Sequence, residues 1–153
     1  MSKMLLTLLS VITLTIQPGD FSREVDCLAQ AVYHEARGEG EGGQIAVAMV
    51  TLNRVKHPKF PDTVCDVVYQ PNQYAWTKSG RARVRDREAW EEIRGLAQSL
   101  MITYHVAGIT PRTDLESLDN ALFFSSNGFK NKRLRHVATV GAHKFYSLGG
   151  LRE

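Results

Sequence analysis

The stretch Tyr33-His34-Glu35-Ala36-Arg37-Gly38-Glu39 ends an apolar segment and leads into a run of glycines. Apolar side chains recur at helical spacing from Val25 onward, which predicts a helix that is capped by Ser22 and runs to about residue 37. The glycines from Gly38 onward are expected to end this helix. Glu35 then lies near the end of a helix whose other face is buried. Partial burial there would raise its pKa above the usual value of about 4.3 for Glu, so that the carboxyl could donate a proton.

Three more helices are expected downstream. Residues 44–55 are apolar on most sides, which predicts a central buried helix. Thr63 is the expected cap of a short helix, and Asp86 is the expected cap of a long helix that runs to about Tyr104. Residues 70–85, which contain Pro, Asn, Gly and many polar groups, are expected to form a long surface loop.

The last part of the chain changes character. Residues 121–124 and 137–145 are typical of short strands, and a Gly- and Lys-rich connection joins them. A chain of 153 residues suits one domain with its own core. The predicted fold class is therefore α+β, predominantly α, with residues 21–153 as one small domain that ends in a short β element.

The first 20 residues differ from this domain. Lys3 precedes an uncharged, mainly apolar run over residues 4–16, and a Gln-Pro-Gly-Asp break follows it. Such a segment is typical of a secretory signal or an uncleaved signal-anchor, although a small-x-small cleavage site is missing. The run is shorter than the roughly 20 apolar residues of a membrane-spanning helix, and a buried first helix or strand is the alternative. We expect export to the periplasm or cell wall, or to the host periplasm if a phage encodes the chain, with transient membrane association through residues 5–16.

Cys27 and Cys65 are the only cysteines. In an exported chain a disulfide between them is expected, whereas in a cytosolic chain two buried thiols would be the default. The absence of a CxxC pattern argues against a zinc ribbon.

Two enzyme classes lack a matching motif. His34-Glu35 begins like the zinc motif HExxH, but Gly38 stands where the second His must lie on the same helix face. The GxSxG elbow of a serine hydrolase is absent, and Cys27 falls within an apolar helix stripe, where a thiol is usually inert. We expect no metal and no cofactor.

Two features stay open on spacing alone. Glu35, Glu39 and Glu41 form an acidic cluster, for which a solvated helix end is the simpler interpretation and proton transfer by Glu35 is the alternative. The loop over residues 69–77 carries amides and aromatics, including Tyr74 and Trp76. Such a loop can bind a sugar, with rings stacked on the pyranose and amides bonded to hydroxyls, or it can simply cover the core.

Charge favours an anionic partner without choosing one. The formal net charge is +3 and the isoelectric point is about 9.0. Basic residues recur within 78–87 and 130–135. Nucleic acid, anionic membrane and bacterial cell wall all fit this pattern, but no nucleic-acid motif accompanies the basic runs.

Ordered blocks over residues 27–39, 43–55, 60–71, 121–124 and 141–146 closely resemble the SleB-type cell wall hydrolases. The resemblance implies a small lysozyme-like fold and cleavage of peptidoglycan glycan strands, with no nucleic-acid partner. The catalytic Glu of the family, the first in its G-E-A-R-G-E motif, falls on Glu35, although His34 replaces the preceding Gly. The family's substrate-binding positions fall on Gln70, Tyr74, Trp76 and His143, and Glu39 is the candidate for a supporting carboxylate.

Within this class we expect a lytic transglycosylase, in which Glu35 acts first as acid and then as base, because the sequence has no obvious second carboxylate at fixed spacing. A hydrolytic muramidase is the close alternative, and it would need Glu39, Glu41 or Asp62 as a second carboxylate. An alternative of another class is a cell-wall or nucleic-acid binding module without catalysis. The biological setting would be bacteriophage lysis, as an endolysin, or remodelling of the bacterial wall.

Overall fold

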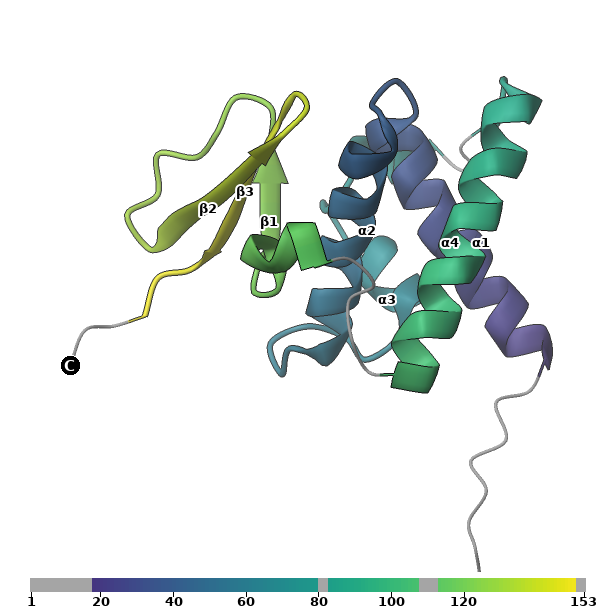
Figure 1. The fold of residues 1–153 in the computed structure, drawn as a ribbon, viewed down its shortest axis with the longest axis horizontal. Helices are drawn as coiled ribbons and strands as arrows, with labels where there is room; N and C mark the ends of the chain where they lie inside the picture. Colours follow the sequence, from purple (N-terminus) through teal and green to yellow (C-terminus); the bar gives the residue numbers. More distant parts are fainter. Residues whose placement is uncertain (1–17, 80–82, 108–112, 151–153) are drawn as a thin grey trace, which may run out of the picture.

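The computed structural model describes residues 18–79, 83–107 and 113–150, and it contains a helical lobe and a small sheet (Figure 1). The helical lobe consists of α1 (Pro18–Ala36), α2 (Glu41–Lys56), α3 (Val64–Val68) and α4 (Arg87–Ala107), with the short 3-10 helices η1 (Ala75–Ser79) and η2 (Thr113–Leu118). The sheet consists of β1 (Phe123–Ser125), β2 (Leu134–Val140) and β3 (His143–Leu148). The predicted class, α+β and predominantly α, is confirmed.

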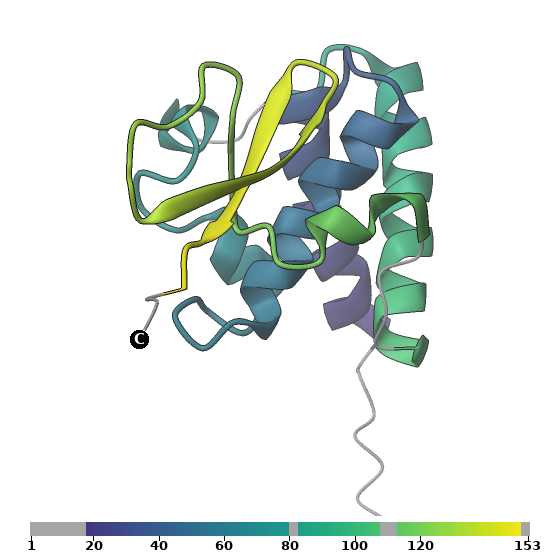
Figure 2. The ribbon, with the colours of Figure 1, turned by 60° about the vertical axis from the view of Figure 1, so that its left-hand side comes forward.

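Helix α2 is the centre of the helical lobe. Every residue from Ile45 to Arg54 is buried, and the helix packs against α1, α3 and α4 as well as against the sheet. The prediction of a central buried helix is therefore confirmed, although the helix begins three residues earlier than expected, after Gly40. Figure 2 shows the sheet lying across this lobe.

Helix α1 begins earlier than the sequence indicated. The described helix starts at Pro18, a residue type that suits the first helical turn, so the prediction of Ser22 as its cap is wrong. The hydroxyl of Ser22 instead accepts a hydrogen bond of 3.3 Å from Arg94 on α4. A disulfide between Cys27 and Cys65 joins α1 to α3.

The predicted caps of the two later helices are confirmed. The hydroxyl of Thr63 accepts a hydrogen bond of 3.1 Å from the backbone N–H of Asp66 at the start of α3. The carboxylate of Asp86 accepts one of 3.1 Å from the backbone N–H of Ala89 at the start of α4. Each acceptor satisfies a backbone donor that the first turn of a helix leaves without an intrahelical partner.

The sheet is antiparallel in the order β1-β3-β2. The segment expected as a strand over 137–145 is a hairpin that begins at Leu134 and ends at Leu148, with a turn at Gly141 between its two strands. Phe145 and Ser147 of the central strand are both buried. A chain reversal at a positive-φ glycine explains why one apolar stretch makes two strands.

The expected surface loop differs from the structure, and the expected N-terminal signal lies outside it. Residues 70–85 are not simply a surface loop, because Tyr74 is only 6% exposed and η1 follows it. The predicted signal or anchor, including residues 5–16, falls almost entirely on residues 1–17, which lie outside the described residues. None of the helices that the structure describes is long and apolar enough to cross a membrane.

Candidate active site

Glu35 lies in the last turn of α1, where its carboxylate is partly buried. Nε1–H of Trp76 donates a hydrogen bond of 2.9 Å to Oε1 of Glu35. Burial raises the pKa of Glu35, while the Trp76 hydrogen bond and the charge of a protonated His143 act in the opposite direction. Because burial is the largest cause, the carboxyl retains its proton to a higher pH than an exposed Glu does.

The ring of Trp76 is held by its neighbours. It stacks with the ring of His34 at 4.6 Å between centroids and with the ring of Tyr74 at 5.5 Å. The exposed ring of Tyr69 meets it edge-on at 6.0 Å. These contacts fix the plane of the indole, so that its single donor stays directed at Glu35.

Tyr74 belongs to the core beneath the site. Its hydroxyl is buried, and its ring also packs against that of Phe124 on β1, at 6.3 Å between centroids. Burial raises the pKa of Tyr74, the charge of Arg54 lowers it, and the carboxylate of Glu35 raises it further. The loop over residues 69–77 was expected either to bind a sugar or to cover the core. Tyr74 covers the core, whereas the half-buried Trp76 is the ring that contacts Glu35.

Glu39 connects the end of α1 to the hairpin. Its carboxylate accepts from the backbone N–H of Ala142, at 3.3 Å from Oε1 and 3.4 Å from Oε2. Nδ1 of His143 lies 3.9 Å from Oε1 of Glu39, which is an ion-pair distance rather than a hydrogen bond. Gly141, at φ 57°, lies so close to this carboxylate that a Cβ there would collide with it. Glu39 thus fixes the turn that carries His143.

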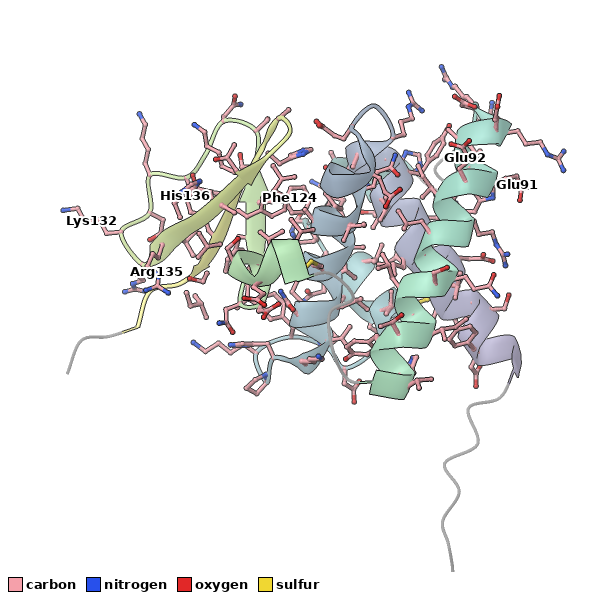
Figure 3. The ribbon with its side chains drawn as sticks, viewed as in Figure 1. Glu91, Glu92, Phe124, Lys132, Arg135 and His136 are labelled. Carbon is pink, nitrogen blue, oxygen red and sulfur yellow. A yellow bond between two sulfur atoms is a disulfide. The ribbon has the colours of Figure 1, made fainter. Side chains whose placement is uncertain are left out.

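The rest of His143 faces aromatic side chains. Its ring meets that of Phe124 edge-on at 5.2 Å, and Figure 3 shows Phe124 extending from β1 towards the helices. Strand β1, the hairpin and the end of α1 therefore meet around His143 and the Glu35 carboxylate. The structure brings Glu35, Trp76, Tyr74 and His143 together from segments far apart in sequence.

The other predicted site residues are placed differently. The side-chain oxygen of Gln70 is buried and has no hydrogen-bond partner among the described residues. Glu41 and Asp62 are exposed. Glu39, the third candidate for a second carboxylate, lies 3.9 Å from Nδ1 of His143.

Two side chains of the site, those of His34 and Phe124, were not predicted to take part in it. His34 packs on Trp76 and bonds to Gln30 at 3.0 Å, and its helical i, i+4 spacing from Gln30 was the only local signal. Phe124 contacts both Tyr74 and His143, which no local pattern predicts. Among the described residues, no group of three His, Cys, Asp or Glu side chains is arranged to hold a metal ion.

Comparison with known proteins assigns the chain to a family. The family model described as Cell Wall Hydrolase matches residues 38–146, most of the chain, beginning three residues after Glu35. The chain belongs to the cell wall hydrolase family. Among curated members, the spore cortex-lytic enzyme of Bacillus subtilis is 42% identical over 76 residues, which are 49% of this chain and 25% of that protein. The corresponding enzyme of Halalkalibacterium halodurans is 42% identical over 66 residues, or 43% of this chain and 20% of that protein. The chain thus spans a quarter or less of these two relatives.

Two solved structures share the fold of this cell wall hydrolase domain. The catalytic domain of the germination-specific lytic transglycosylase SleB from Bacillus anthracis superposes with a TM-score of 0.60 at 26% identity, over 86% of this chain and 100% of that one. The catalytic domain of the Bacillus cereus SleB protein gives 0.58 at 27% identity, over 81% and 89%. The suspected membership of the SleB-type hydrolases and the lysozyme-like α+β fold are both confirmed.

Proposed function

We propose that the chain is a peptidoglycan-degrading enzyme that cleaves the bond between N-acetylmuramic acid and N-acetylglucosamine, as a lytic transglycosylase. The observation that carries the proposal is the environment of Glu35. A partly buried carboxyl with a raised pKa, oriented by one hydrogen bond from Trp76, has the properties of a general acid. The similar SleB protein of Bacillus anthracis is a lytic transglycosylase.

The reaction needs one carboxyl in two roles. Protonated Glu35 gives its proton to the bridging oxygen, the glycosidic bond breaks, and positive charge develops at the anomeric carbon of the muramic acid. The resulting carboxylate then takes the proton of the C6 hydroxyl of the same sugar while the C6 oxygen attacks the anomeric carbon. This closes a 1,6-anhydro ring and returns Glu35 to its protonated form, so no water is consumed.

Trp76 and His143 have supporting roles in this scheme. The indole N–H stabilises the Glu35 carboxylate that exists between the two proton transfers, because it donates to the charged form. A protonated His143 acts in the same direction through its charge. The exposed ring of Tyr69 beside Trp76 offers an aromatic surface for a sugar, and the assignment of Gln70 to sugar binding stays a prediction.

A hydrolytic muramidase is the second candidate, and Glu39 is the observation that favours it. Hydrolysis needs a second carboxyl about 5–9.5 Å from the first, to attack the sugar or to activate water. Glu39 lies one helical turn beyond Glu35 in sequence and near His143. Its carboxylate is already engaged by the backbone of Ala142, which favours a structural role and hence the transglycosylase.

The decisive experiment is mass analysis of the products that purified protein releases from sacculi. Anhydro-muramic ends support the transglycosylase, and reducing ends alone would refute it in favour of hydrolysis. Glu35→Gln should lower the rate by about 10²–10⁴-fold while the fold remains intact. Glu91→Gln, the same change on an exposed position of α4, is the matched control and should retain full activity. Binding to sacculi without any cleavage by wild-type protein would favour a non-catalytic module instead.

Glu39→Gln separates the two chemistries. The amide oxygen can still accept from the N–H of Ala142, so the hairpin stays in place while the charge is lost. A transglycosylase that depends on Glu35 alone should retain most of its rate. A loss as large as that of Glu35→Gln would identify Glu39 as a second reacting carboxylate.

The proposed setting is outside the cytoplasm, in wall remodelling or in phage lysis as an endolysin. The signal-like residues 4–16 support export, with residues 5–16 as the segment that would touch the membrane. N-terminal sequencing of secreted material tests this, because intact Met1 in soluble cytoplasm would contradict it.

A further inference from the structure

Positive charge is concentrated in the sheet lobe. Residues 121–150 contain no Asp or Glu and five basic side chains: Lys130, Lys132, Arg133, Arg135 and Lys144. The rest of the chain contains 14 of the 19 Lys and Arg residues and all 16 Asp and Glu residues. Figure 3 shows Lys132 in the turn before β2 and Arg135 on β2, with Glu91 and Glu92 on α4 at the far side of the molecule. The proposed catalysis at Glu35 does not account for this asymmetry.

A pocket of about 440 Å³ lies between this lobe and the end of α2, away from the Glu35 site. The end of α2, the segment after η2 and the paired ends of β2 and β3 form its walls. Its lining comprises Asn53, Lys56, His57, Pro58, Asp119, Asn120, Leu122, Arg135, Ser147 and Leu148. None of these side chains contributes to the site around Glu35. The hairpin turn of that site packs near Gly42, and Asn53 lies eleven helical residues further along α2, a rise of about 16 Å.

The polar lining favours an anionic group. Lys56, His57 and Arg135 outnumber the single carboxylate of Asp119. The backbone N–H of Lys59 donates to Nδ1 of His57 at 3.2 Å, so a neutral imidazole there carries its proton on Nε2 and can donate it to a ligand. Within the part of the chain that the structure describes, Arg135 has no ion-pair partner.

The pocket also contains a buried polar atom for which the described residues provide no hydrogen-bond partner. Ser147 is only 3% exposed, and its hydroxyl has no hydrogen-bond partner among the described residues. A buried hydroxyl is normally bonded, so this one is suited to a ligand group. The neighbouring amide of Asn53 is held rigidly, because its nitrogen donates to the carbonyls of Leu118 and Ala121 at 2.8 and 2.9 Å. The side chain of Asn53 is therefore fixed in place before any ligand binds.

We propose that this pocket binds a stem peptide of peptidoglycan, with a peptide carboxylate at Arg135 and His57. The proposal rests on the proposed function and names a second subsite for the same substrate. Stem peptides carry carboxylates, a diamino acid and alanine methyl groups. Arg135 and His57 suit the carboxylates, and Leu122 and Leu148 suit the methyl groups. The glycan backbone itself has no free carboxylate once its lactyl group is joined to the peptide.

Binding is tested with the tripeptide L-Ala-γ-D-Glu-meso-diaminopimelate, titrated into ¹⁵N-labelled full-length protein. Saturable shifts are expected for the Ser147 and Leu148 amides and the side-chain amide of Asn53. Arg135→Gln should weaken binding at least about tenfold, as expected for loss of a charged hydrogen bond. Arg133→Gln removes the same charge two residues away, outside the pocket lining, and should change the affinity less than about twofold. Absence of saturable shifts at these positions would overturn the proposal.

Activity provides the second test. On sacculi with intact stems Arg135→Gln should raise KM with little change in kcat, and on glycan strands stripped by an amidase it should behave as wild type. Arg133→Gln should match wild type on both substrates. Equal losses of activity in the Arg135 and Arg133 variants would overturn the stem-peptide subsite in favour of a general surface for anionic polymers. The same conclusion would follow if polyglycerol phosphate displaced the tripeptide and both substitutions weakened its binding equally. Loss of cleavage in Glu35→Gln tests the catalytic proposal separately, because it does not depend on Arg135.

Discussion

Nε1 of Trp76 donates a 2.9 Å hydrogen bond to Oε1 of Glu35, across 41 positions of sequence. This bond opposes the effect of burial, which raises the pKa of Glu35. The site therefore combines one influence that keeps the proton on Glu35 with another that stabilises the carboxylate after the proton has left. That combination suits a group that must act as acid and then as base.

Trp76→Phe should extend activity to higher pH. The change removes the donor that lowers the pKa of Glu35 while it keeps an aromatic ring beside His34. Since the general acid must be protonated, activity falls as pH rises through the pKa of Glu35. A higher pKa therefore moves this alkaline limb of the pH profile to higher pH. The measurement is the pH dependence of kcat/KM. Trp90→Phe, the same change on α4, should leave the limb in place, and a downward movement in Trp76→Phe would contradict the assignment.

Glu35→Gln should make the protein more stable at neutral pH. A carboxyl whose pKa is raised by folding stabilises the native state fully below the ordinary pKa of Glu, and this contribution is lost as pH rises through the raised value. The advantage of the Gln variant should therefore be absent at low pH and grow through that window. Urea unfolding at several pH values measures it. The exposed control Glu91→Gln should show no such trend, and a stability loss in Glu35→Gln at every pH would refute the argument.

Removing the disulfide should cost about 2–4 kcal/mol of unfolding free energy, because the Cys27–Cys65 link closes a long loop and restricts the unfolded chain. The double variant Cys27→Ser/Cys65→Ser, compared with oxidised wild type by urea unfolding, gives the value. Reductant should destabilise wild type and leave the variant unchanged. A cost below about 1 kcal/mol would mean that the link contributes little.

Gly141→Ala should destabilise the protein by about 1–3 kcal/mol and lower its activity. The residue has φ 57°, and a side chain there would collide with the Glu39 carboxylate that holds the hairpin turn. His143 would move with the turn. Thermal unfolding and rates on sacculi measure the two effects. Gly95→Ala on α4, where a Cβ meets nothing within 4 Å, should instead stabilise by about 0.5–1 kcal/mol, so similar effects of the two substitutions would contradict this account.

Local patterns predicted the elements well where the signal is local. The buried α2 follows from its nearly continuous apolar sequence, and the caps at Thr63 and Asp86 follow from residue type. The start of α1 was placed too late because Ser22 is a good cap by type, yet nothing local shows that the helix already continues through it. The sequence pattern does not show that residues 137–145 belong to a two-stranded hairpin, because the turn between the strands depends on a single glycine, Gly141.

Residue pattern alone identifies Glu35 as the candidate acid, because it stands at the end of an apolar helix within ordered blocks of a known family. It also indicated a predominantly helical domain with a small β element. Only the tertiary structure decided the environment of that carboxyl. The indole of Trp76, the His34 ring stacked on it and the contacts of Glu39 with the hairpin join residues 41 to 104 positions apart. Burial and hydrogen bonding across such separations set a pKa, and neither can be obtained from residue type or periodicity along the chain.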